Sequence, residues 1–529
     1  MTKGFRRPPA GTAGVSRNPG QSAQGYSLDE ARAAVQEAER FRLTGKLDKA
    51  RTTCLSVLRQ YPDFVAALHT LGLTLADNAE YERALNNLHR ASMLNPHDAN
   101  TLTALGGVYL RMGFSEVAAR SMEHALKLAP DNAAIHATLG EIYREEKEYE
   151  YSCQAYERAL ELDPSFTAAE VGLARCCDHI GDLQCAAAIY NKMVASGSRS
   201  ISALYMLSQL PSDLIEFDVL ALLDEAASDP RTMAKPASQK QLGFARATAL
   251  DKAGRHEEAW KEIVAVRKTE RREHHQTYQK RRALYDRVRE LMASEDMAPI
   301  APCDDVPDLP LSLFIVGPSR SGKTTLERLV GGLDGVKRGY ENPIVENGVR
   351  RAFKASGFPT RSRPLELPAG LSKPFRDYYV EELRERAASA RVFTNTLPSR
   401  NEDALRIASC LPNTRFVFVR RDVEDLTIRI YMRNYKSGNE YAWNIEDIRH
   451  YLDWCHAMMG IMAARMPDNA IVINYEDMVA DPDAALAKTA GLCGLEVRDT
   501  APAIVGDDRG CGQPYAAFVR SALEQRRAA

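Results

Sequence analysis

The sequence predicts an α-solenoid followed by a three-layer α/β domain of the phosphate-loop type with a mainly parallel sheet. Four prolines in the first part of the chain lie 34 residues apart, namely Pro62, Pro96, Pro130 and Pro164. In the second part, a glycine-rich loop with the pattern G-x-x-x-x-G-K-[ST] begins at Gly317. A repeated helical unit therefore precedes a predicted phosphate-binding loop.

Small residues follow the same period as the prolines, which indicates a true repeat. One column of small residues contains Gly72, Gly106 and Gly140. Another contains Ala50, Ala84, Ala118, Ser152 and Ala186. Small side chains let two antiparallel helices approach closely, and proline ends the second helix because it cannot continue the hydrogen-bond ladder. The pattern resembles the tetratricopeptide repeat, with about five units between residues 31 and 200.

Composition divides the chain into five parts. Residues 1–26 are rich in Gly, Pro and Ser and are expected to form a disordered tail. Repeats are expected over residues 27–200, followed by a degenerate repeat or capping helices and a highly charged helix over residues 201–295. A proline-rich linker at 296–310 then leads to the phosphate-loop domain at 311–529.

Net charge and hydropathy argue against two classes of protein, general nucleic-acid binders and proteins that span a membrane. A formal net charge of −2 argues against general nucleic-acid binding, which requires a basic excess. No apolar run approaches the roughly 20 residues that a membrane span needs. The ten cysteines show no metal-type spacing and are interpreted as free, mostly buried thiols in a reducing compartment. We therefore expect a cytoplasmic protein.

The predicted loop has the context that phosphate binding requires. An apolar run at 311–316 precedes the loop and helical periodicity begins at Leu326, so backbone N–H groups of the loop and the helix start converge on an anion. Taken alone, the loop indicates an ATP-dependent kinase or ATPase, which also needs an acid for magnesium after a second strand. The predicted strand at 414–419 instead leads to Arg420 and Arg421. Two arginines suit a bare phosphate group better than a divalent cation.

Three motifs in matching order carry a family resemblance. RSGKTTLE begins at Arg320, RRDVED at Arg420 and NYEDMVADP at Asn474. Together they resemble the sulfotransferases that use 3′-phosphoadenosine 5′-phosphosulfate (PAPS), and in particular the bacterial branch in which tetratricopeptide repeats precede the catalytic domain. The resemblance covers the repeats and most of residues 311–490. It implies transfer of a sulfuryl group from PAPS, without a metal, to a hydroxyl or amine of a protein, glycan or small molecule.

The resemblance also implies roles for single residues. The loop around the 5′-phosphosulfate would contain Arg320, Ser321, Gly322, Thr324 and Thr325. Arg421 would hold the 3′-phosphate of the donor. Glu341 would act as the base that takes the proton from the acceptor hydroxyl.

The sequence departs from the family pattern at three positions that are expected to contact the donor. Lys323 is an extra residue in the loop, Arg429 stands where the family has a serine, and Thr396 stands where it has a lysine. Lys323 can reach the phosphates in place of the missing lysine and act as a catalytic cation. Arg429 either strengthens the 3′-phosphate contact or marks a different donor. The three departures together also fit a non-catalytic repeat scaffold with a degenerate nucleotide site.

For several of these residues the sequence also allows a purely structural role. Arg420 and Arg421 can pair with nearby surface acids, and Glu341 can be an ordinary solvated loop residue. Residues 507–509 form either a lid over the nucleotide or an exposed tail. The arm is expected to dock an acceptor protein or glycan in its concave groove, or to mediate homo-oligomer formation.

Overall fold

The computed structural model describes residues 26–294, 303–357, 361, 363–398, 401–435, 439–498, 500–501, 504 and 507–527. The predicted disordered tail lies outside the described residues except for Tyr26, and the predicted linker at 296–310 is described only from residue 303. The chain divides into two compact units, Met1–Pro130 and Asp131–Ala529.

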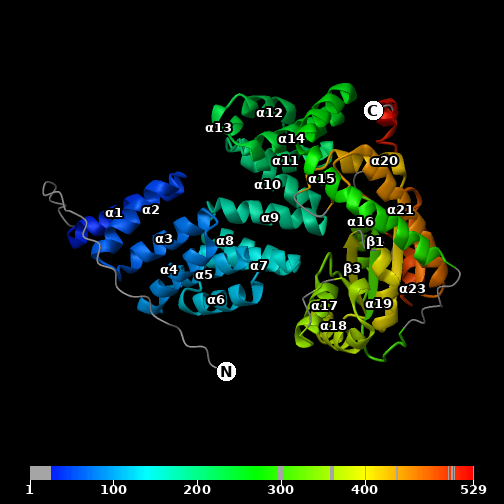
Figure 1. Cartoon of the computed structure of the whole chain (residues 1–529), viewed down its shortest axis with the longest axis horizontal. Helices are drawn as coiled ribbons and strands as arrows, with labels where there is room; N and C mark the ends of the chain where they lie inside the picture. Colours follow the sequence, from blue (N-terminus) through cyan, green and yellow to red (C-terminus); the bar gives the residue numbers. More distant parts are fainter. Residues whose placement is uncertain are drawn as a thin grey trace, which may run out of the picture. The chain divides into compact units, whose positions relative to one another are not determined.

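The first unit consists of helix pairs (Figure 1). Their bounds are α1 (Leu28–Leu43) with α2 (Leu47–Gln60), α3 (Val65–Asp77) with α4 (Tyr81–Leu94), and α5 (Ala99–Arg111) with α6 (Ser115–Leu128). The helices α2, α4 and α6 each end two residues before a repeat proline, as predicted. A Cβ on Gly72 would lie 2.6 Å from Leu88, so glycine is what allows α3 and α4 to pack this closely.

The second unit begins with two further pairs of the same kind. They are α7 (Ala133–Glu145) with α8 (Tyr149–Leu162), and α9 (Thr167–Ile180) with α10 (Leu183–Ala195). Gly140 packs against the ring of Tyr156 as Gly72 packs against Leu88. The predicted helical repeats are therefore confirmed.

Less regular helices follow the repeats. They are α11 (Ile201–Gln209), α12 (Val219–Ala227), α13 (Pro230–Met233), α14 (Pro236–Lys252) and the long α15 (His256–Ala293). Helix α15 contains the charged segment, yet Arg267 within it is only 1% exposed. Its guanidinium donates to the carbonyl oxygens of Tyr431 and Arg433 at 2.7 and 2.8 Å. This charged side chain of α15 therefore supports the α/β domain.

The α/β domain contains one parallel sheet of five strands in the order β2-β3-β1-β4-β5. The strands are β1 (Leu311–Gly317), β2 (Val336–Lys337), β3 (Val392–Pro398), β4 (Thr414–Arg420) and β5 (Ala470–Asn474). Central β1 pairs with β3 and β4, with Phe314 opposite both Asn395 and Phe416. The predicted mainly parallel sheet is confirmed.

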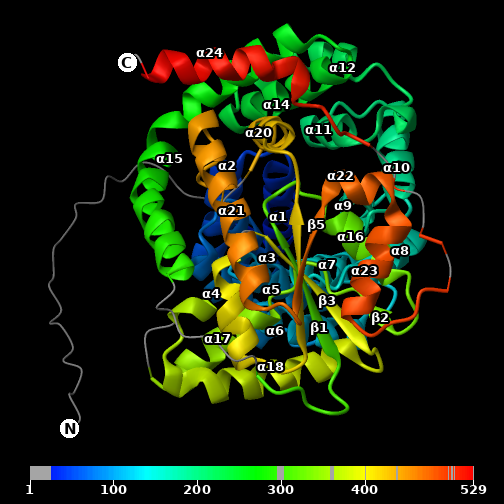
Figure 2. The same ribbon diagram turned by 90° about the vertical axis from the view of Figure 1, so that its right-hand side faces the viewer.

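Helices cover both faces of this sheet. Alternate strand residues such as Leu313 and Val417 pack with α16 (Lys323–Gly331), α22 (Tyr475–Ala480) and α23 (Pro482–Leu492). Residues such as Phe314 and Phe416 belong to the core that also contains α17 (Ile344–Ala355), α18 (Ser372–Ala387), α19 (Ala404–Cys410) and α21 (Ile445–Arg465). Figure 2 shows α21 and the pair α16 and α23 on opposite sides of the strands. The remaining helices of the domain are α20 (Val423–Tyr431) and α24 (Ala516–Arg527).

One pair of cysteines differs from the expectation of free thiols. Cys177 in α9 and Cys185 in α10 form a disulfide, with their Cα atoms 5.9 Å apart. The other eight cysteines are free thiols, as predicted.

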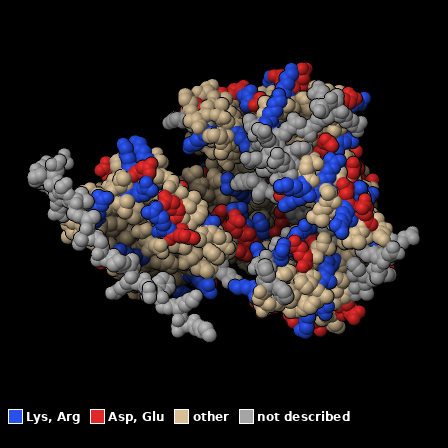
Figure 3. All heavy atoms as spheres, viewed as in Figure 1, with Lys and Arg blue, Asp and Glu red and all other residues tan. Residues whose placement is uncertain are grey.

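The surface carries many charged side chains of both signs. Acidic and basic side chains are interspersed on the face shown in Figure 3. Among the described residues, no helix has the length and apolar character needed to cross a membrane.

Candidate functional site

The phosphate loop lies between β1 and α16, at the carboxyl edge of the sheet. Gly322 has a left-handed backbone (φ 98°) directly before α16 begins. Ser321 is fully buried, and its Oγ has no hydrogen-bond partner among the described residues. A buried hydroxyl without a partner is costly. The N–H groups at the start of α16 include those of Thr324, which is exposed, and Thr325, which is half-buried. These groups and the Ser321 hydroxyl can together bind an anionic ligand.

Lys323 is buried below the loop. Its Nζ donates to the carbonyl oxygens of Gly317 and Pro318, both at 2.9 Å. Burial lowers the pKa of Lys323 to about 8, although the charge of nearby Glu341 opposes this shift. In this structure the ammonium thus braces the loop backbone and places a positive charge under the loop.

Arg320 lies beside a second arginine. Arg320 is exposed, and the charge of the neighbouring Arg433 guanidinium is the main cause that lowers the pKa of Arg320 to about 10. Tyr435, two residues beyond Arg433, donates its hydroxyl to Ser319 Oγ at 2.8 Å and so links this segment to the loop. Two guanidinium groups that repel each other beside a phosphate loop favour binding of an anion.

Arg421 connects the loop to the C-terminal segment. Its side chain is buried, with Nη1 donating to the Arg320 carbonyl oxygen at 3.1 Å and Nη2 donating to Asp508 Oδ1 at 2.8 Å. The guanidinium also lies 4.3 Å above the ring of Tyr475. Its weaker ion pair with Asp425 spans 3.8 Å, so Asp508 is its main acidic partner.

Asp508 also binds the other predicted arginine. Arg429 Nε donates to Asp508 Oδ2 at 2.6 Å, and Tyr475 donates its hydroxyl to Oδ1 at 2.9 Å. Burial alone would raise the pKa of the Asp508 carboxyl, but Arg429 and Arg421 outweigh it and hold this pKa below its ordinary value. A carboxylate therefore lies between Arg421, which the resemblance assigns to the 3′-phosphate, and Arg429, which stands where the family has a serine.

The segment after Asp508 is fixed to α20. The N–H groups of Gly510 and Gly512 donate to the two carboxylate oxygens of Asp425 at 2.7 and 2.8 Å. The alternative of an exposed tail at residues 507–509 is therefore wrong for Asp508, which faces Arg421.

Glu341 lies in the turn that follows β2. Its charge raises the pKa values of Lys323, Tyr149 and His179, and for the lysine and histidine it acts against the larger effect of burial. Glu341 itself is exposed. The charge of Glu341 therefore acts on Lys323 in the phosphate loop.

Glu327 holds this turn and was not singled out from the sequence. It is 1% exposed, and its Oε1 accepts hydrogen bonds from Tyr340 N–H at 2.9 Å and Thr394 Oγ1 at 2.5 Å. Burial raises the pKa of its carboxyl. One feature of the sequence could have indicated that Glu327 is buried: it directly follows Leu326, on the apolar face of the predicted helix.

Thr396 contacts the Tyr340 turn through its backbone. It is buried in β3, and its N–H donates to the Tyr340 carbonyl oxygen at 2.8 Å. The position at which the family has a lysine thus helps to hold the Tyr340 turn. In the part of the chain that the structure describes, His, Cys, Asp and Glu side chains do not gather into a group of three or more that could hold a metal ion.

Comparisons with known proteins agree with both parts of the chain. Residues 310–499 match the sulfotransferase family, and residues 133–166 and 152–201 match two tetratricopeptide repeat families. No curated protein matches the sequence.

Solved structures of repeat proteins resemble part of the chain. A thermophilic TPR protein of Thermus thermophilus is 21% identical, with a TM-score of 0.30, over 31% of this chain and 90% of that chain. MamA from Desulfovibrio magneticus is 22% identical, with a TM-score of 0.27, over 32% of this chain and 94% of that chain. PilF of Pseudomonas aeruginosa is 17% identical, with a TM-score of 0.31, over 45% of this chain and 98% of that chain.

Proposed function

We propose that this protein, which carries a sulfotransferase-family domain after tetratricopeptide repeats, transfers a sulfuryl group from PAPS to a hydroxyl or amine acceptor. The observation that carries the proposal is the position of Arg421. It follows β4, the strand next to β1, and its guanidinium donates to the loop at Arg320. A triphosphate enzyme would keep a magnesium-binding acid after such a strand. An arginine there favours a donor with a separate phosphate group.

Two groups of residues would bind the two ends of the donor. The 5′-phosphosulfate would lie at the loop, near the unpaired hydroxyl of Ser321, the N–H groups of Thr324 and Thr325, and the guanidinium of Arg320. The 3′-phosphate would lie at Arg421 and Arg429, where it would replace the carboxylate of Asp508.

The transfer requires a base on the acceptor side of the site. The bond between sulfur and the bridging phosphate oxygen breaks, and a bond forms between sulfur and the acceptor oxygen or nitrogen. Glu341 accepts the acceptor's proton, and Arg320 together with the loop N–H groups stabilises the negative charge that develops on the leaving phosphate. We assign Lys323 to the same task from beneath the loop, since its ammonium sits under the loop carbonyls.

The repeat arm would serve acceptor recognition or self-association. Tetratricopeptide repeats form extended surfaces that bind other proteins, so a protein acceptor, or a glycan on a protein, suits this arm. An ATP-dependent kinase or ATPase is the alternative that the loop sequence GPSRSGKT itself favours.

Turnover of the donor tests the proposal. The full-length protein is incubated with PAPS and a set of hydroxyl and amine acceptors, and release of 3′-phosphoadenosine 5′-phosphate (PAP) is followed by chromatography. Glu341→Gln should lower the rate by about 100-fold or more, which is the usual contribution of a general base. Asp334→Asn alters another exposed acid of the same region and should leave the rate unchanged. Equal rates for Glu341→Gln and the wild type would remove Glu341 from the mechanism.

A further inference from the structure

The turn that presents Glu341 is fixed by the α/β domain at its backbone. Tyr340 has a left-handed backbone (φ 54°), which is unfavourable for a bulky residue. Its N–H donates to Glu327 and its carbonyl oxygen accepts from Thr396. At Gly339, any Cβ would collide with the Thr394 carbonyl oxygen. These contacts hold the turn on its sheet side.

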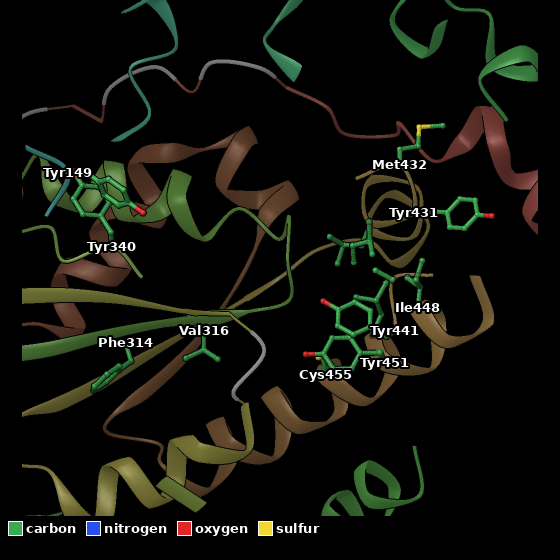
Figure 4. Close-up of a cluster of buried hydrophobic side chains, with 14 of the residues drawn as sticks. Tyr149, Phe314, Val316, Tyr340, Tyr431, Met432, Tyr441, Ile448, Tyr451 and Cys455 are labelled. Carbon is green, nitrogen blue, oxygen red and sulfur yellow. The ribbon is translucent and has the colours of Figure 1, made fainter. Parts of the chain in front are cut away.

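Helix α8 of the repeat arm holds the same turn from its other side. The ring of Tyr149 meets that of Tyr340 edge to face, with centroids 4.9 Å apart and an angle of 88° between the planes. Figure 4 shows these two side chains next to each other. The Tyr340 hydroxyl donates to Glu150 Oε1 at 2.6 Å. Both rings are 4% exposed, so this contact is a buried one.

The C-terminal end of α9 makes a second set of contacts with the α/β domain. Arg338 donates from Nη1 to the Ile180 carbonyl oxygen at 2.8 Å, and Arg328 donates to that of Gly181 at 3.4 Å. The last carbonyl groups of a helix lack partners within the helix and attract cations. The Arg338 guanidinium also lies 4.4 Å from the centre of the Tyr340 ring. One arginine therefore joins the arm to the residue that precedes Glu341.

Side chains of α9 support Tyr149 and act electrostatically on the phosphate loop. The His179 ring stacks on Tyr149, with centroids 4.8 Å apart and an angle of 20°. The charge of Asp178 acts on Arg320 in the phosphate loop. The arm thus contacts the turn that precedes Glu341, and the charge of its Asp178 acts on the loop.

From these contacts we infer that the repeat arm completes the catalytic site, with Tyr149 acting as a positioning residue that holds Tyr340 and hence Glu341. The inference rests on the proposed role of Glu341 as the base. A turn with a strained residue at Tyr340 would sample other conformations if its packing were lost, and the Tyr149 contact restricts it to the one that faces the phosphate loop. The arm would then control the rate of transfer in addition to choosing the acceptor.

Hydrogen–deuterium exchange of the full-length protein tests the contact without any acceptor. In Tyr149→Ala, amides of residues 338–342 should exchange at least about tenfold faster, because local opening of the turn becomes easier. Tyr149→Phe keeps the ring and should restore the wild-type rate. Tyr109→Ala removes a tyrosine that pairs with His89 inside the first unit, and it should leave these amides unchanged.

Turnover of PAPS then tests the positioning role. In Tyr149→Ala, kcat should fall at least about tenfold while KM for PAPS stays within about twofold, because the donor residues are untouched. Tyr149→Phe should recover kcat. If Tyr149→Ala fails to fold, Tyr340→Phe removes only the hydrogen bond to Glu150 and should give a smaller change in the same direction.

The outcomes separate the two proposals. Wild-type exchange at residues 338–342 in Tyr149→Ala, or faster exchange with unchanged kcat, overturns the positioning role. A wild-type protein that neither binds PAP nor consumes PAPS overturns the sulfotransferase assignment and, with it, the catalytic part of this inference.

Discussion

Asp508 places its carboxylate Oδ1 2.8 Å from Nη2 of Arg421, the arginine that we propose for the 3′-phosphate of the donor. Arg429 binds the other oxygen of the same carboxylate. In the proposed function, binding of the donor at Arg421 therefore requires this ion pair to break.

Replacing Asp508 with Asn should strengthen binding of PAP. The amide carries no charge and competes less well for Arg421 and Arg429, so PAP affinity should rise by about tenfold, or 1.4 kcal/mol. Calorimetric titration measures this change. Asp507→Asn is the matched control, since Asp507 is more exposed and pairs with Arg509. Weaker binding in Asp508→Asn would mean that Asp508 orients the arginines for the ligand.

Loss of the Lys323 charge should weaken PAP binding as the pH rises through about 8, the pKa of this buried lysine. The ammonium under the loop attracts the anion only while it is protonated. Titrations between pH 7 and pH 9.5 should show the decline in the wild type and a smaller one in Lys323→Met. Parallel curves for the two proteins would exclude Lys323 as the titrating group.

The same pKa predicts the sign of a stability change. An unfolded lysine titrates near 10.4, so between about 8 and about 10.4 the unfolded chain binds more protons than the folded chain. The free energy of unfolding of the wild type should therefore rise with pH in this window, relative to Lys323→Met. Melting temperatures at pH 7.5 and pH 9.5 measure it, and a relative fall would contradict the account.

Removing the Glu327 carboxylate should destabilise the α/β domain. Glu327→Ala leaves the Tyr340 N–H and the Thr394 hydroxyl without their buried acceptor, at a cost of about 3 kcal/mol. Glu327→Gln keeps an acceptor oxygen and should cost less. Thermal unfolding distinguishes the variants, and a Glu327→Ala protein as stable as the wild type would show that the turn does not depend on this carboxylate.

Arg267 should be needed for the stability of the α/β domain although it belongs to the charged helix α15. Its guanidinium binds backbone carbonyl oxygens near Arg433 and lies 4.7 Å from the ring centre of Phe244. Arg267→Ala should lower the free energy of unfolding by on the order of 3 kcal/mol, since hydrogen bonds from a buried charge are lost. Lys268→Ala, at the exposed neighbouring position, should have little effect. Equal melting temperatures for the two variants would refute this role.

Local sequence patterns were sufficient to predict most of the fold. The 34-residue period defines the helix pairs because each unit repeats the same packing. The apolar runs before Gly317 and Arg420 predicted β1 and β4, since buried parallel strands are continuously apolar.

Contacts between distant parts of the chain could not be predicted in this way. Tyr340 and Glu150 are 190 residues apart, and Arg421 and Asp508 are 87 apart. No local periodicity specifies such pairs. The burial of Arg267 was missed for the same reason, because a charged helix is exposed in the absence of a partner surface.

Calorimetric titration of the full-length protein with PAP, and with ATP in the presence and absence of magnesium, tests the central claim most directly. The account predicts micromolar binding of PAP that does not require magnesium. Binding should be lost in Arg421→Ala and kept in Arg415→Ala. Arg415 is an arginine of β4, the strand that Arg421 follows, and it pairs with Asp305. Magnesium-dependent binding of ATP with no binding of PAP would contradict the account and favour a kinase or ATPase.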